Sequence, residues 1–244
     1  MQVVTVFDRR TALPRGAVRL PSAHRWPVAD KTSSNGHLIP LGAAGGIVGL
    51  STLQLAVGEP VWKQLPAELK GRQSATFPGP SGPEYVSFLW KNSLYVLDPV
   101  DGQLLWQRSL KGITPEMASN QRLDVFGDRD VLVVQSPDRS SYEVFETSTG
   151  RALHSIRPGF DPRQWQMVYG HRVVGITDTP GSKSLLVHDL KLNVAEISVP
   201  VGERVLPFPL GRGEIAFFHG NGRINVIDMS QGRMSFETTL DSSE

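Results

Sequence analysis

Acidic or amide residues recur along the chain at the start of short polar turns, and their side chains are the first candidates for chemistry. Each turn ends four residues later at Gly or at a residue that replaces it; the six turns are Asp8–Ala12, Gln54–Gly58, Asp98–Gly102, Glu146–Gly150, Asp189–Asn193 and Asp228–Gly232. Carboxylates could ligate Ca²⁺, which takes about six to eight oxygen ligands. Each acid here stands alone rather than in an oxygen-rich loop. We therefore interpret these acids as turn formers, since a short acidic side chain accepts hydrogen bonds from the next backbone N–H groups.

The other reactive residue types show no catalytic or metal-binding pattern. The six histidines have no i,i+4 pair and no metal-ligand spacing, and we interpret His188–Asp189 as a packed strand end. The segment Gly42–Gly46 resembles a phosphate loop but lacks its Lys-Ser/Thr ending, and no Gly-x-Ser-x-Gly elbow is present. The chain has no cysteine, which excludes disulfides, catalytic thiolates and thiolate zinc sites. We predict no catalytic residue, no cofactor and no metal ion.

The composition is that of a globular chain without a strongly basic surface. Of the 244 residues, 39% are hydrophobic and 20% charged, and the net charge is +1, from 25 Lys and Arg against 24 Asp and Glu. Electrostatic nucleic-acid binding requires a basic field that this balance does not supply. The sequence has neither an apolar run of about 18 residues for a membrane span nor the apolar core of a signal peptide. We predict no nucleic-acid partner and no membrane span, and we expect a cytosolic chain or a piece of a longer one.

The turns are nearly evenly spaced, and similar residues flank them. They end at positions 12, 58, 102, 150, 193 and 232, so the spacings are 46, 44, 48, 43 and 39 residues. Apolar residues mostly occupy the second and fourth positions before each acid and after each glycine, as Leu104 and Trp106 do; Thr52 and His154 are exceptions. Alternation of period two predicts a strand with one buried face on each side of the turn. Each turn is therefore expected to close a β-hairpin.

A second hairpin precedes most of these turn-closed hairpins along the chain. The clearest runs from Glu214–His219 through Gly220–Gly222 into Arg223–Asp228 and contains Asn-Gly, a strong hairpin signal. Further short strands are expected at Leu123–Phe126, Trp165–Tyr169 and Val205–Pro209. A typical repeat therefore supplies about four strands.

Four-stranded repeats of roughly 40 residues are typical of a β-propeller, in which neighbouring blades cover each other's faces. We predict an all-β, single-domain propeller over residues 1–244, with five complete blades over 23–240 and only the outer two strands of a blade over 1–22. Because an incomplete blade exposes edges and apolar faces, we expect a fragment of a longer chain. The aromatic residues that follow the turns are expected to fill gaps between sheets; they include Trp62, Trp106 and Phe236.

The stretches LYVLDPVDGQLLW, YEVFETSTGRALH and IAFFHGNGRINVIDMSQGRMSF resemble the PQQ-like (pyrroloquinoline-quinone enzyme type) propeller repeat. That repeat ends in Asp-x-x-Thr-Gly-x-x-x-Trp. Asp98, Gly102 and Trp106 match this pattern, with Asp101 in place of Thr, whereas His154 stands where the pattern has Trp. No Trp-Asp dipeptide is present, which argues against the WD40 repeat.

The resemblance implies a non-enzymatic bacterial scaffold similar to outer-membrane assembly lipoproteins, in the periplasm or cell envelope. Its expected partner is another protein or other domains of the same longer chain. The alternative is a propeller related to quinoprotein dehydrogenases that has lost or lacks its catalytic part. Those enzymes use an adjacent Cys pair over the quinone and a Ca²⁺ ion with an Asp base, and the absence of cysteine excludes the pair.

Propellers present loops at one end of the axis, where partners usually dock. Thr76–Pro83, rich in Pro, Gly and Ser, is expected as a loop between blades at that end. The candidate interaction residues lie in other such loops; they are Trp90, Lys91, Arg139, Asp161, Arg163 and His219.

Overall fold

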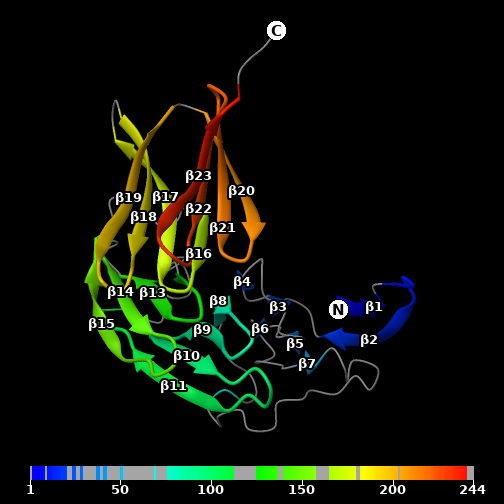
Figure 1. Cartoon of the computed structure of the whole chain (residues 1–244). Helices are drawn as coiled ribbons and strands as arrows, with labels where there is room; N and C mark the ends of the chain where they lie inside the picture. Colours follow the sequence, from blue (N-terminus) through cyan, green and yellow to red (C-terminus); the bar gives the residue numbers. More distant parts are fainter. Residues whose placement is uncertain are drawn as a thin grey trace. The chain divides into compact units, whose positions relative to one another are not determined.

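The computed structural model is all-β, as predicted, and is built mainly of antiparallel sheets (Figure 1). It describes residues 2–8, 10–20, 24–25, 28–29, 37–38, 41–42, 50–51, 69, 76–112, 125–136, 140–157, 165–179, 182–202 and 204–240. None of these forms a helix long and apolar enough to cross a membrane. Most of the first predicted complete repeat, including its turn Gln54–Gly58 and Trp62, lies outside the described residues.

The chain divides into two compact units. Unit 1 comprises Met1–Val125 and Ser148–Gly150, and unit 2 comprises Phe126–Thr147 and Arg151–Glu244. The single domain predicted over residues 1–244 remains a prediction.

Unit 1 contains a separate hairpin and one large sheet. The hairpin pairs β1 (Gln2–Phe7) with β2 (Pro14–Leu20). The large sheet has the order β11-β10-β9-β8-β4; its strands are β4 (Val28–Ala29), β8 (Thr76–Ser81), β9 (Val86–Trp90), β10 (Ser93–Leu97) and β11 (Leu104–Ser109). Two short pairs complete the described strands; they join β3 (His24–Arg25) to β6 (Leu41–Gly42) and β5 (His37–Leu38) to β7 (Leu50–Ser51).

The prediction of a loop at Thr76–Pro83 is wrong, because most of this segment forms strand β8. This strand pairs antiparallel with β9 and, over Val28–Ala29, parallel with β4. Pro80 stays compatible with the sheet because its free carbonyl accepts a 2.6 Å hydrogen bond from Ser87 Oγ. A proline lacks only the backbone donor. Strand β8 thus completes four antiparallel strands, and β4 adds a fifth, parallel strand that the four-strand repeat does not predict.

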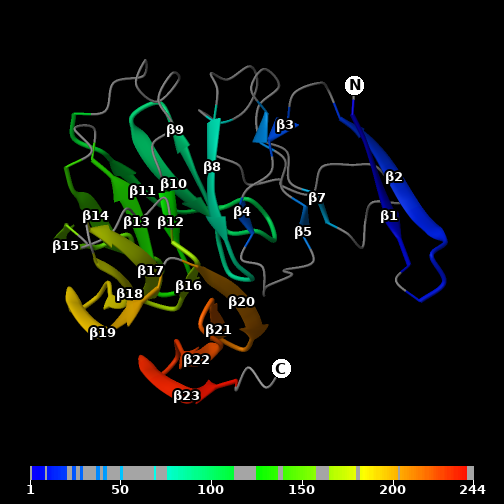
Figure 2. The same cartoon turned by 90° about the horizontal axis from the view of Figure 1, so that it is seen from above.

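Three four-stranded antiparallel sheets follow, each in chain order, mostly within unit 2. Their strands are β12 (Val125–Gly127), β13 (Val131–Gln135), β14 (Tyr142–Glu146), β15 (Ala152–Ile156), β16 (Met167–Tyr169), β17 (Arg172–Thr179), β18 (Ser182–Asp189), β19 (Val194–Val201), β20 (Val205–Gly211), β21 (Glu214–His219), β22 (Arg223–Asp228) and β23 (Arg233–Thr239). Figure 2 shows the last two sheets side by side in unit 2. One apolar cluster joins β12–β15 to β16–β19, and a second joins β16–β19 to β20–β23. These sheets therefore pack as successive propeller blades.

The outer hairpin, meaning the last two strands of each blade, has one register throughout the described chain. A Val is the last paired residue before a one-residue bulge in each of the five copies; the pairs are Val6–Gly16, Val96–Trp106, Val144–His154, Val187–Ile197 and Val226–Phe236. The residue that ends each turn has a positive φ of 55–79°; these residues are Ala12, Gly102, Gly150, Asn193 and Gly232. The hairpin β1–β2 is therefore an outer hairpin, although no further strand pairs with it among the described residues.

Candidate interaction surfaces

Several turn acids accept hydrogen bonds from their own turns. Asp98, Asp189 and Asp228 each accept backbone N–H groups of their own turns on one carboxylate oxygen, at 2.6–3.2 Å. The hydroxyl of Ser230 also donates to Asp228, and this hydrogen bond holds the pKa of the carboxyl below its usual value. The described residues contain no group of three or more side chains able to hold a metal ion.

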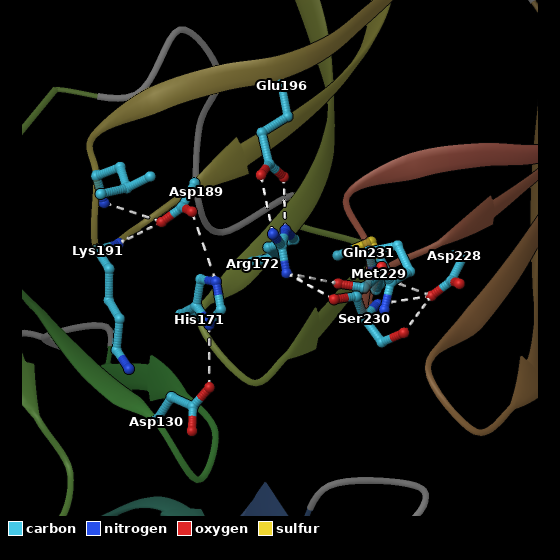
Figure 3. Close-up of polar contacts among 11 residues, drawn as sticks. Asp130, His171, Arg172, Asp189, Lys191, Glu196, Asp228, Met229, Ser230 and Gln231 are labelled. Carbon is cyan, nitrogen blue, oxygen red and sulfur yellow. Dashed lines mark hydrogen bonds and ion pairs between the residues drawn. The ribbon is translucent and has the colours of Figure 1, made fainter.

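One histidine lies between two of the carboxylates in unit 2 (Figure 3). His171 Nδ1 lies 3.0 Å from Asp130 Oδ2, and its Nε2 lies 3.5 Å from Asp189 Oδ2. Asp130 belongs to the β12–β13 turn, His171 to the β16–β17 turn, and Asp189 ends β18. Because both ring nitrogens face carboxylates, the imidazole bridges turns of neighbouring blades.

A second polar link joins the last two blades (Figure 3). Arg172 makes a bidentate pair with Glu196, at 2.6 and 3.0 Å, and its Nη1 donates to the carbonyl of Ser230 at 2.9 Å. The hydrogen bond to Glu196 raises the pKa of Arg172. The guanidinium therefore holds the β22–β23 turn against β17 and β19.

The residue four positions after the turn glycine contacts the outer turn of the next blade in two copies. In unit 1, the Trp106 ring lies directly against Gly150, and the Nε of Arg108 donates to the Gly150 carbonyl at 2.6 Å. In unit 2, His154 Nε2 lies 2.9 Å from the carbonyl of Leu190. His154 thus occupies the position that Trp106 occupies.

Phe236 occupies the same position in the last blade, and here the prediction that it fills a gap is wrong. Its side chain is 53% exposed, because no other sheet in the described part of unit 2 covers that face of β20–β23. Its neighbours across the sheet are also apolar. By strand register, one row runs Phe208–Ala216–Val226–Phe236 and the next runs Leu206–Phe218–Ile224.

We call these seven residues the trailing face of the last blade. Phe208 is 59% exposed, and Leu206, Phe218 and Phe236 are exposed as well. The corresponding residues of the preceding blade are buried instead; they are Met167, Val174, Leu185 and Val187. They pack in one cluster with residues of the opposite face of β20–β23, which are Ile215, Phe217, Ile227 and Met229. The trailing face therefore has the composition of a blade–blade interface but faces solvent. Exposed contiguous apolar surface commonly marks an interaction site.

The interaction residues named from sequence lie elsewhere. Trp90 is buried in the unit 1 core against Tyr95, with ring centroids 5.7 Å apart. Lys91 is exposed, and its Nζ lies 4.2 Å from the Trp90 ring centroid. Trp90 is thus a core residue rather than a loop contact. Arg139, Asp161 and Arg163 lie outside the described residues.

His219 does lie at a hollow in the surface. Together with Gly202, Arg204, Gly220 and Asn221 it lines an open pocket of about 440 Å³. The His219 side chain is buried, its Nε2 has no hydrogen-bond partner, and burial lowers its pKa. The imidazole thus exposes little of its surface to a ligand in this pocket. The pocket is therefore a weaker candidate than the trailing face.

Sequence reasoning missed the trailing face, although a signal was present. Leu206, Phe208 and Leu210 alternate in VLPFPLG, which places three large apolar side chains on one face of β20. Pattern alone does not reveal whether a neighbouring sheet covers them.

No protein-family model matches this chain, and no curated protein sequence matches it. Among solved structures, BamB from Moraxella catarrhalis is similar at 15% identity and a TM-score of 0.47. The match covers 98% of this chain and 70% of the BamB chain. The computationally designed protein Ika8 is similar at 16% identity and a TM-score of 0.52, covering 93% of this chain and 65% of its own. Dihydro-heme d1 dehydrogenase NirN is similar at 15% identity and a TM-score of 0.51, covering 98% of this chain and 52% of its own.

The chain thus spans less than two thirds of the length of Ika8 and of NirN. At these identities the likeness concerns the fold alone. NirN contains a β-propeller, and the successive four-stranded blades of unit 2 have the same type of architecture. The chain has a β-propeller-type fold.

Proposed function

We propose that this chain is a non-catalytic module of the PQQ-like propeller type that binds another protein through the trailing face of β20–β23. The observation that carries this proposal is the exposure of a face whose counterpart in the preceding blade is a buried interface. Burying a large apolar side chain fully contributes roughly 1.5–3 kcal/mol. A patch centred on Phe208, Phe218 and Phe236 can therefore supply the aromatic anchors of a protein interface.

The polar sites support the non-catalytic part of the proposal. His171, Arg172 and the turn acids bind one another or backbone groups of adjacent turns. The Gly-x-x-x-Trp contact of Trp106 on Gly150 and the positive φ of the turn glycines support the PQQ-like assignment. In this proposal the repeat residues build the scaffold, and the uncovered face does the binding.

Site-specific photocross-linking tests the proposal. Benzoylphenylalanine at position 236 is expected to give adducts with a partner protein in an extract of the producing cells, and the variant Phe208→Ser is expected to abolish them. Leu192 is also largely exposed but lies in the β18–β19 turn, so the same probe at position 192 is the matched control. Equal adducts from both positions, or none from position 236, would refute the proposal.

The stability of the variants separates binding from folding. Because Phe208 is already exposed, its replacement by Ser is expected to change the free energy of unfolding by no more than about 0.5 kcal/mol. Phe217 is fully buried on the opposite face of the same blade, and Phe217→Ala is expected to cost about 3–5 kcal/mol. A Phe208→Ser variant as unstable as Phe217→Ala would show that the trailing face is a core rather than a binding surface.

A further inference from the structure

An asparagine followed by glycine lies in the turn that joins β21 to β22. Asn221 is exposed, and Gly222 follows it with φ +84°. Asparagine is a thermolabile residue, because the backbone nitrogen of the next residue can attack its side-chain carbonyl carbon. A glycine has no Cβ to hinder that approach. The turn therefore places an unhindered nucleophile beside an exposed side-chain amide.

The turn also polarises the side-chain carbonyl of Asn221. The N–H of Arg223 donates to Asn221 Oδ1 at 3.2 Å. Attack on Cγ moves negative charge onto this oxygen, and a donor that is already in place stabilises the charge. The folded turn therefore activates the amide as well as exposing it.

A second hydrogen bond of the turn opposes the reaction. Gly222 N–H donates to the carbonyl of His219 at 3.0 Å, whereas attack requires this nitrogen to be free and deprotonated. One hydrogen bond between neutral groups shifts an equilibrium by about two- to tenfold. Because short turns open locally without global unfolding, this hydrogen bond is expected to slow the reaction rather than to prevent it.

Two other asparagines of the described chain lack this combination. Asn193 precedes Val194, and its Oδ1 lies 3.1 Å from His188 Nε2. Asn225 is fully buried in β22 and precedes Val226. A β-branched side chain is stiff and crowds its own backbone, so it hinders attack by its nitrogen. These two asparagines are internal references for the reactivity of Asn221.

We propose that Asn221 is a site of spontaneous deamidation, with water as the co-reactant. The Gly222 nitrogen bonds to Asn221 Cγ, the bond from Cγ to Nδ2 breaks, and the proton of the attacking nitrogen passes through solvent to the departing ammonia. Water then opens the cyclic succinimide at either carbonyl, which gives aspartate or isoaspartate. Each conversion consumes one water and releases one ammonia. The proposal does not depend on the function proposed above.

The isoaspartate product changes the turn. Its main chain passes through the former side chain, which lengthens the path between positions 221 and 222. In the unmodified chain, Gly222 N–H donates to His219 and the Gly222 carbonyl accepts the N–H of Leu240 at 2.9 Å. The longer path displaces Gly222 from these contacts, so hydrogen exchange at the amides of Gly222 and Leu240 is expected to accelerate about fivefold.

The experiment uses the unaltered full chain. It is incubated at neutral pH, sampled over time and digested with trypsin in heavy-oxygen water, which labels any conversion that occurs during digestion. The three asparagines fall in separate tryptic peptides, which are residues 213–223, 192–204 and 224–233. Mass spectrometry is expected to show at least about tenfold faster conversion at Asn221 than at Asn193 or Asn225, which react only through larger openings.

A synthetic peptide of residues 219–224, HGNGRI, measures the reaction without the folded turn. Asn221 in the folded chain is expected to convert about two- to tenfold more slowly than in this peptide, because the hydrogen bond to His219 must open first. The dipeptide Asn35–Gly36 lies outside the described residues, and its own tryptic peptide keeps its signal separate.

Two variants separate the reaction from its effect on the turn. Asn221→Gln keeps a side-chain amide but must close a larger ring, so its exchange at Leu240 is expected to stay constant during the incubation. Asn221→Asp carries the new charge without the longer main chain. Faster exchange at Leu240 in the incubated chain than in Asn221→Asp therefore identifies isoaspartate, and equal exchange would overturn the expected effect on the turn.

Conversion at Asn221 ahead of Asn193 and Asn225 supports the proposal. It is overturned if Asn221 stays intact in the folded chain while the peptide HGNGRI converts completely. Equal rates at the three asparagines also overturn it, because the reaction would then proceed through the unfolded chain and not through the turn.

Discussion

Substituting Gly150 by alanine tests the contact on which the blade architecture depends most directly in unit 1. Gly150 ends the β14–β15 turn with φ +66°, and an added Cβ would lie 2.6 Å from Cε3 and 2.9 Å from Cγ of Trp106. A Cβ is essentially never found closer than 3.0 Å to another heavy atom. The Trp106 ring, which is buried, must therefore shift.

Two costs add in this variant. The left-handed conformation costs an alanine about 1–2 kcal/mol, and forcing extra volume into a packed contact costs about 1–3 kcal/mol. Gly150→Ala is therefore expected to lower the free energy of unfolding by about 2–5 kcal/mol. Gly211→Ala is the matched control, because Gly211 has φ +93° but open space around its Cβ position. It is expected to lose only the conformational cost of about 1–2 kcal/mol.

Urea unfolding followed by tryptophan fluorescence measures both variants. A double variant, Trp106→Ala with Gly150→Ala, separates the steric part, because removing the ring leaves only the cost of the left-handed alanine. The two substitutions are then expected to be less than additive. Equal losses for Gly150→Ala and Gly211→Ala, or full additivity with Trp106→Ala, would refute the docking of the Trp106 ring on the turn.

Two further predictions concern the polar groups of unit 2. Burial lowers the pKa of His188, so the unfolded chain binds a proton that the folded chain does not. Stability is therefore expected to fall as the pH drops below about 6.5. The variant His188→Gln is expected to lose less stability over this range, as measured by urea midpoints at several pH values. An unchanged pH dependence in His188→Gln would contradict this assignment. Arg172→Met is expected to lower the free energy of unfolding by about 1–3 kcal/mol, because it leaves Glu196 without its partner. The double variant with Glu196→Gln is expected to lose less than the sum of the single losses, and strict additivity would show that the pair contributes nothing.

The outer hairpins could be predicted from the sequence because their information is local. The acid, the residue that tolerates positive φ and the alternating apolar neighbours lie within about a dozen residues. Even the degenerate turn Asp8–Ala12 has this geometry, with Ala12 at φ 55° and Asp8 accepting the N–H groups of Arg10 and Thr11. A local hydrogen-bond pattern leaves a local signature.

Features that depend on the partner of a strand could not be predicted in this way. The pair of Asp130 and His171 joins residues 41 positions apart, and no spacing rule connects them. The prolines of Thr76–Pro83 suggested a loop, but Pro78 and Pro80 lie in strand β8, where the Pro80 carbonyl accepts a hydrogen bond from Ser87 Oγ. Trp90 was assigned to a loop from the adjacent Lys91–Asn92 turn, yet its ring points into the core, since the strand and not the turn sets its direction.

The repeat itself explains why the candidate surfaces lie where they do. A blade has two faces and one inner pairing edge, and in β16–β19 the neighbouring sheets of unit 2 cover both faces while the turn acids bind backbone groups. Such a blade has little left to recognise a partner. Among the described residues, no further strand pairs with the hairpin β1–β2, and no other sheet of unit 2 covers the trailing face of β20–β23. In the proposed function, a position that packs between blades elsewhere serves binding on β20–β23. Phe236→Ser is therefore expected to reduce binding, whereas its equivalent Trp106 packs against Gly150.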